Sequence, residues 1–179
     1  MQRSWRSDAD KLTFIACLAT ASLFEDSEVK AGELDSPSQM IGDVNLFLTA
    51  DDSPRTCTGE LELMIAPLAH RRRGYGRATV LAFLHYVAIY LSSILAEFAA
   101  KEGVENMVLS QLKVKIGESN KKSIGLFESI GFVKIRETSN YFGEFELVLE
   151  GDLDEERTKA LLEKWGVQSW KELRYIEEN

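Results

Sequence analysis

Apolar and polar positions alternate along the first third of the chain. Met40–Leu48 alternates with the two-residue period of a half-buried strand, apart from one slip around Gly42 and Asp43, and Glu60–Ile65 alternates acidic with apolar side chains before an apolar end. Leu12–Thr20 has the β-branched and aromatic content of a buried strand. The segments between them, Phe24–Gln39 and Ala50–Thr58, are rich in acidic residues, Ser, Pro and Thr, which is typical of loops. The pattern predicts three strands that follow one another as an antiparallel meander.

The period then becomes helical and predicts one long helix that stops at Gly103. Its stretch Ala78–Ala96 carries no formal charge and approaches the ~20 residues that cross a bilayer. His85 and Ser92–Ser93 interrupt the apolar surface, and a helix that is apolar all round is also typical of the inside of an α/β protein. A buried helix is therefore favoured over a membrane span, and no membrane partner is expected.

The next segments predict more strands and a second helix. Val104–Ile116 holds one or two short strands, and Asn120 is placed to cap a helix that ends before Gly131. Two further strands are expected over Phe132–Thr138 and Glu144–Glu150. Strands, helix, strand, helix and two strands predict an α/β (α+β) fold, a mixed sheet with helices on its faces.

The composition becomes charged after Gly151. Asp152–Lys164 and Ser169–Glu177 are candidates for amphipathic helices. We therefore expect one domain over residues 1–150 and a charged helical tail over residues 151–179. The acidic tail is interpreted as a solvated appendage, and docking of a basic partner is the alternative.

Length and charge limit the classes of function. The 179 residues are 45% apolar, enough for the core of one domain, and the formal net charge of −8 argues against a dedicated nucleic-acid binder. Cys17 and Cys57 cannot build a disulfide framework, and no Cys/His spacing suits a zinc site. We expect a reducing, cytoplasmic location and no metal.

The motif with the clearest chemistry follows the third strand and opens the long helix. Its residues are Arg71, Arg72, Arg73, Gly74, Tyr75, Gly76 and Arg77. Backbone N–H groups at a helix N-terminus form a cradle for anions, and glycines allow that backbone to approach a phosphate. Thr79 replaces the third glycine of a dinucleotide fingerprint, and Gly117–Ser123 lacks the second glycine of a P-loop. What remains is R-x-x-G-x-G, for which a tight turn with solvated arginines is the alternative explanation.

A second motif lies downstream with the spacing N-x-x-[AS]-x-x-[LM]-[YF]-x-x-x-G-F. It comprises Asn120, Ser123, Leu126, Phe127, Gly131 and Phe132. With both motifs in this order, the chain resembles the GNAT family of N-acetyltransferases over roughly Leu12–Glu150. The phrases SWRSDADKLTFI, MIGDVNLFL, GELELMIA and KIGESNKKSIGLFESIGF are most similar to the tubulin-directed, N-acetyltransferase-nine-like subgroup.

The resemblance implies a fold, a co-substrate and the residues that bind it. The fold is a mixed, mostly antiparallel sheet flanked by helices, and the co-substrate is acetyl-CoA. Met64, Ile65 and Ala66 would present backbone groups to its thioester and pantetheine arm. Arg71–Arg77 would hold its pyrophosphate, mainly through main-chain N–H groups, and the Asn120 side chain would bond the pantetheine or adenylate arm. The acceptor would be a protein amine, with the amino terminus of tubulin as the specific expectation.

Proton transfer is less well specified by the resemblance. An attacking amine must lose a proton, and Glu62 and Glu60 are the candidate bases because they lie on the strand beside the proposed thioester. Acids that alternate along a strand are also commonly solvent-facing. Many relatives carry a tyrosine as general acid where this chain has Phe127, so the general acid is unassigned. A catalytically silent module that binds CoA or a partner is therefore the alternative function.

Two departures from the family pattern concern whole segments. The family begins with one strand and two helices before the strand expected at Leu12, so the chain is interpreted as N-terminally incomplete, with one sheet edge unpaired. Ser93–Ser110 carries extra residues, which either extend the long helix or interrupt the next strand.

Overall fold

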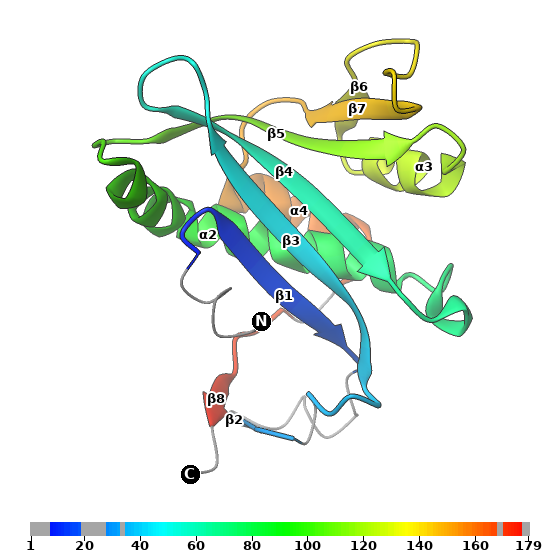
Figure 1. Cartoon of the computed structure of the whole chain (residues 1–179). Coiled ribbons are helices and arrows are strands. Elements are labelled where there is room, and N and C mark those ends of the chain that lie inside the picture. Colours follow the sequence, from blue (N-terminus) through cyan, green and yellow to red (C-terminus); the bar gives the residue numbers. More distant parts are fainter. Residues whose placement is uncertain (1–7, 19–27, 33–34, 168–169, 177–179) are drawn as a thin grey trace.

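The computed structural model describes residues 8–18, 28–32, 35–167 and 170–176. A six-stranded sheet with the order β1-β3-β4-β5-β7-β6 is the centre of the molecule (Figure 1). Its strands are β1 (Lys11–Cys17), β3 (Met40–Ala50), β4 (Thr56–Ile65), β5 (Val108–Gly117), β6 (Phe132–Lys134) and β7 (Glu144–Leu149). All neighbours are antiparallel except β4 and β5, which run parallel. The mixed, mostly antiparallel sheet is confirmed, and β1, β3 and β4 form the predicted meander.

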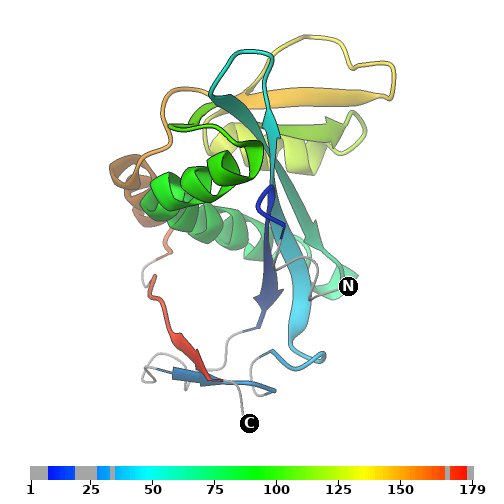
Figure 2. The ribbon, with the colours of Figure 1, turned by 60° about the vertical axis from the view of Figure 1, so that its left-hand side comes forward.

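Helices α2 (Tyr75–Glu102) and α4 (Glu155–Lys164) lie on the same side of the sheet (Figure 2). The third helix, α3 (Lys121–Ser129), packs Ile124 and Phe127 into the same core. By length and composition, α2 is long and apolar enough to cross a membrane. Here it is the central helix of the core, because side chains such as Leu81 and Leu84 are almost fully buried.

Local signals place the helix ends as predicted. Asn120 caps α3, with its side-chain oxygen accepting the N–H of Ser123 at 3.2 Å. Gly103 ends α2 with φ 68°, and Gly131 follows α3 with φ 101°. Both φ values lie in the left-handed region that glycine adopts without strain.

The extra residues over Ser93–Ser110 are accommodated in two ways. They extend α2 to Glu102, and they introduce one bulge at Ser110, where the register between β4 and β5 shifts. The Ser110 hydroxyl donates to the Asp51 carboxylate at 2.6 Å and also lies 2.9 Å from the Cys57 carbonyl oxygen. The first of these contacts lowers the pKa of Asp51 below its usual value. Val104–Ile116 therefore contains one bulged strand rather than two.

The second amphipathic helix expected over Ser169–Glu177 is a wrong prediction. Arg174–Ile176 instead forms strand β8, which pairs in parallel with β2 (Glu28–Lys30) away from the main sheet (Figure 2). The Tyr175 hydroxyl donates to Asp35 at 2.7 Å, and the Ala31 N–H donates to the Ile176 carbonyl at 3.0 Å. A partner from the segment expected to be a loop thus overrides the local helical pattern. The strand after α3 is also shorter than expected and ends at Lys134.

Helix α4 shares the core of the preceding domain. Leu162 is buried, and the Thr158 side chain faces His85 of α2. Because the Thr158 hydroxyl already donates to the Asp154 carbonyl oxygen at 2.9 Å, His85 Nδ1 donates to Thr158 Oγ1, also at 2.9 Å. His85 is therefore a satisfied core residue, and it ties α4 to α2.

Candidate functional site

Strands β4 and β5 separate halfway along β4. Their pairing ends at Glu60 and Lys113, whereas β4 continues to Ile65 and the rest of β5 pairs with β7 (Figure 1). A cavity of about 1020 Å³ lies at this split, between the end of β4, the start of α2 and the first turns of α3. The predicted cofactor residues that line it are Met64, Ile65, Arg71, Arg72, Gly74, Gly76, Arg77 and Asn120. Folding thus brings both sequence motifs to one cavity.

The start of α2 presents free backbone donors to this cavity. The first intrahelical bond runs from the Ala78 N–H to the Gly74 carbonyl at 3.0 Å, so the N–H groups of Tyr75, Gly76 and Arg77 have no partner within the helix. Gly74 occupies the N-cap with φ 91° and provides no side-chain cap. The first turn contains no acidic residue. These features leave the positive end of the helix open to an anion.

Gly74 and Gly76 have different surroundings. Gly74 has open space around it, and its requirement is the left-handed φ. A side chain on Gly76 would come within 3.4 Å of Leu63 and 3.7 Å of Ile65. These are ordinary van der Waals distances, so a methyl group at Gly76 would contact the end of β4 without a clash.

The arginines of the motif have distinct environments. Arg71 turns back to the end of β4, where its Nε donates to the Ile65 carbonyl at 2.7 Å and its Nη2 to the Ala66 carbonyl at 3.0 Å. Arg72 is exposed at φ 62°, and the Arg77 guanidinium lies 3.7 Å from the centre of the Trp165 ring. None of these arginines forms an ion pair with a carboxylate in the described parts of the chain. The wall of the cavity at α2 is therefore positive without internal compensation.

The hydrogen-bonding pattern of β4 shows which of its residues turn their backbone toward the cavity. Leu63 is one of them and lines the cavity, although the sequence prediction did not include it. The Ala66 N–H donates to the Ile41 carbonyl of the neighbouring segment at 2.8 Å, which directs the even-numbered backbone groups of β4 toward β3. The backbone of Leu63 and Ile65 therefore points to the side on which β5 has separated. Ala66 has both backbone groups bonded within the chain and does not line the cavity. The alternation rule for antiparallel strands was the signal that would have found Leu63.

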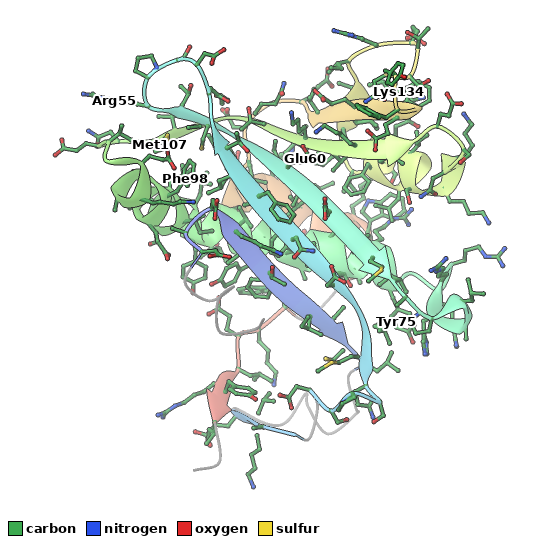
Figure 3. All side chains as sticks on the ribbon, in the orientation of Figure 1. Arg55, Glu60, Tyr75, Phe98, Met107 and Lys134 are labelled. Atoms are coloured by element: carbon green, nitrogen blue, oxygen red, sulfur yellow. The ribbon has the colours of Figure 1, made fainter. Side chains whose placement is uncertain are left out.

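The two candidate bases lie on β4 but do not line the cavity. Glu60, labelled midway along β4 in Figure 3, accepts from Lys115 Nζ at 2.8 Å, and this bond raises the pKa of Lys115 above its usual value. Glu62 is exposed, stands opposite Asn45 of β3, and lies on the same face of the sheet as the cavity-lining Met64. Of the two carboxylates, Glu62 is the one without an ion pair to a described lysine or arginine.

Two further side chains, Phe127 and His70, lie outside the cavity. Phe127 is only 4% exposed and packs edge-on against Phe132, so it belongs to the core and not to the cavity wall. His70 lies beside Tyr75 with ring centres 5.8 Å apart, outside the cavity lining. In the parts of the chain that the structure describes, no group of three His, Cys, Asp or Glu side chains is placed to hold a metal ion.

Comparison with known proteins identifies relatives that cover most of the chain. A family model described as an acetyltransferase (GNAT) domain matches residues 2–133. An N-acetyltransferase 9-like protein of Schizosaccharomyces pombe is 40% identical over 83% of this chain and 74% of its own length. The alpha/beta-tubulin-N-acetyltransferase 9 proteins of Homo sapiens and Drosophila melanogaster are 38% and 36% identical over 83% and 76% of this chain.

The chain spans 57% of the fly protein and 60% of the human protein. Among solved structures, a GNAT-family acetyltransferase from Streptococcus pneumoniae aligns with 20% identity and a TM-score of 0.45 over 82% of this chain and 69% of that chain. The family model covers most of the present sequence, and the S. pombe relative exceeds 30% identity over most of both chains. The chain therefore belongs to the GNAT family of acetyltransferases.

Proposed function

We propose that this protein is an acetyl-CoA-dependent N-acetyltransferase that acts on a protein amine. The observation that carries the proposal is the cavity at the split between β4 and β5, into which the uncapped start of α2 opens. That cavity combines a positive helix end with an unpaired stretch of strand backbone. Each of these features fits a different part of one elongated, anionic thioester.

The residues present fit the donor part by part. The N–H groups at the start of α2, with Arg72 and Arg77, would hold the diphosphate. The cleft-facing backbone of Leu63 would bond an amide group of the pantetheine arm as a neighbouring strand would. The side-chain oxygen of Asn120 already caps α3, so the side-chain NH₂ group of Asn120 is left to donate to the bound donor.

The bound donor supplies an activated acetyl group, and the chain supplies binding, orientation and proton transfer. Alignment of an amine with a fixed acyl carbon removes much of the entropic barrier to transfer. The Ile65 N–H points into the cleft and would donate to the acyl oxygen as negative charge develops there. Glu62 would accept the proton of the acceptor ammonium, because the Glu60 carboxylate is held by Lys115.

The acceptor proposed is the α-amino group of a protein, with the amino terminus of tubulin as the first candidate. This choice is supported by the names of the human and fly relatives, which are described as tubulin N-acetyltransferases. The exposed face of β4 that carries Glu62 and Met64 is the side from which a peptide would approach the cleft.

The test separates binding from turnover. Isothermal titration with acetyl-CoA measures the first, and mass spectrometry of peptides with free amino termini, including those of α- and β-tubulin, measures the second. Binding together with donor-dependent addition of an acetyl group at the terminal amine supports the proposal. Absence of donor binding by the folded chain contradicts it.

The second candidate function is a silent GNAT-like module that binds CoA without transferring acetyl. It is favoured by Phe127, which places a buried phenyl ring where many relatives carry a tyrosine acid. Acetyl-CoA binding with no acetylated peptide above the buffer control would identify this function. Glu62→Gln is the matched variant, because it should slow turnover only in the first case.

A further inference from the structure

Arg77 and Trp165 form an unusual pair at the wall of the cavity. The centre of the Arg77 guanidinium lies 3.7 Å from the centre of the Trp165 ring, which places the cation directly on the aromatic face. Arg77 Nε and Trp165 Nε1 are both buried, and neither donor has a hydrogen-bond partner among the residues that the structure describes. Arg77 also lines the cavity at the start of α2.

This placement of Arg77 is unfavourable unless an anion is nearby. A cation in the first turn of a helix is repelled by the positive end of the helix dipole. Arg77 has no ion pair with a carboxylate in the described chain, and its first turn carries no acid. The Trp165 face offers part of the missing negative potential, and a phosphate in the adjoining cavity would provide the rest.

Trp165 comes from a different part of the chain, at the end of α4. The backbone N–H of Trp165 donates to the Leu161 carbonyl oxygen at 3.1 Å, and Gly166 follows with φ 71°. The His85–Thr158 bond and the buried Leu162 hold α4 on α2, so the ring has a defined position. Trp165 lies outside residues 2–133, the part of the chain that the family model matches.

We propose that Trp165 is a positioning residue for the cofactor cavity, holding the Arg77 guanidinium beside the phosphate-binding start of α2. The inference rests on the proposed function, since it concerns the same cavity. It assigns the C-terminal segment a role in donor binding that the two sequence motifs do not contain. Because coupling is reciprocal, a bound donor should also hold α4 more firmly on α2.

The experiment compares two tryptophans of the same segment. Trp165→Leu removes the ring under Arg77, whereas Trp170→Leu removes a ring that packs on His85, with ring centres 4.8 Å apart. Titration with CoA, at a temperature where all variants are folded, should show about tenfold weaker binding for Trp165→Leu. Trp165→Phe should lie between this value and the wild type, and Trp170→Leu should stay within about twofold of the wild type.

Two further measurements separate positioning from general damage. Pantetheine, which lacks the phosphates, should compete for the cavity equally well in Trp165→Leu and in the wild type. In an Arg77→Met background, Trp165→Leu should cause little additional loss of CoA affinity, because the two residues act as one unit. Hydrogen exchange of Glu155–Lys164 should slow when CoA binds to the wild type and slow less in Trp165→Leu.

The outcomes also separate this inference from the proposed function. A wild type that binds no CoA contradicts both. A wild type that binds CoA, with Trp165→Leu unchanged or with Trp165→Leu and Trp170→Leu weakened equally, overturns the role of Trp165 and leaves the proposed function in place.

Discussion

Helices α2 and α4 begin in opposite ways. The start of α4 is capped by Asp154, whose carboxylate accepts the Arg157 N–H at 2.7 Å, and Glu155 and Glu156 follow in its first turn. The start of α2 has Gly74 at the cap, no acid in its first turn and Arg77 in the third position. Both helix N-termini carry a similar partial positive charge, because that charge arises from the aligned peptide dipoles of the helix.

The difference separates a structural helix end from one that is available for binding. At α4 the chain provides its own anions, which accept the Arg157 N–H and compensate the helix dipole, so no ligand is required. At α2 the same compensation is withheld, and the end opens into the cavity beside β4. Four sets of variants test whether this contrast carries function.

Gly42→Ala should have the largest effect on stability and on CoA binding. The N-terminal end of α2 packs on the end of β4, and β3 holds that part of β4 in place through Gly42. An added methyl group at Gly42 would lie 1.8 Å from the Met64 carbonyl oxygen, a clash that only backbone movement can relieve. We expect unfolding free energy to fall by about 3 kcal/mol and CoA binding to be lost.

Gly117→Ala is the matched control, because a methyl group there meets no atom within 4 Å. Urea denaturation of both variants measures the difference. Equal stability of the two variants would contradict this account of the β4 end.

Tyr75→Glu places an acid in the first turn of α2, as in α4. The carboxylate should compete with the diphosphate for the helix end and weaken CoA binding at least tenfold, about 1.4 kcal/mol. Tyr75→Gln makes the same change of shape without the charge. The melting temperature of Tyr75→Glu should be slightly higher than that of Tyr75→Gln, because an acid in the first turn is stabilised by the helix dipole. Calorimetric titration and thermal melts test both signs, and a glutamate that leaves affinity equal to that of glutamine would refute a phosphate site here.

Asp154→Ala removes the cap of α4. The free energy of unfolding should fall by about 1 kcal/mol, because the Arg157 N–H loses its partner. CoA affinity should stay within about twofold, since the folded state keeps Trp165 in place. Denaturation and titration of the same preparation check the pair of values, and a large loss of affinity with unchanged stability is the contrary result.

Glu155→Gln and Glu156→Gln should have the smallest effects. Each removes one exposed anion from the first turn of α4 and should cost about 0.3 to 1 kcal/mol at low salt. The loss should shrink in high salt because the charges are exposed. Melting curves at two ionic strengths provide the measurement, and a salt-independent loss would point to a contact other than the helix dipole.

Much of the architecture was predictable because its signals are local. The caps at Asn120, Gly103 and Gly131 depend on a side-chain acceptor or on a left-handed φ, and the residue type nearly specifies each. The segment Ser169–Glu177 failed for the opposite reason. Its amphipathic pattern fits a helix, but β8 is decided by pairing with Glu28–Lys30, which is distant in the sequence.

The candidate site divides in the same way. Arg71–Arg77 was located correctly at the start of a long helix, yet the Arg71 side chain is used to close the end of β4, and Ala66 has no free backbone group. Leu63 faces the cleft instead, because the partner strand sets which residues of β4 bond toward β3. The contact of Trp165 with Arg77 joins segments that no local pattern connects.

The order of residues alone predicts the strands of the main sheet, the helix ends and the glycines at the start of α2, because these depend on side-chain type and on interactions a few residues apart. Folding in three dimensions settles which donors and charges remain uncompensated. Whether a donor or charge is compensated depends on partners contributed by distant strands and helices. This difference makes the start of α2 a candidate binding site and leaves the start of α4 with a structural role.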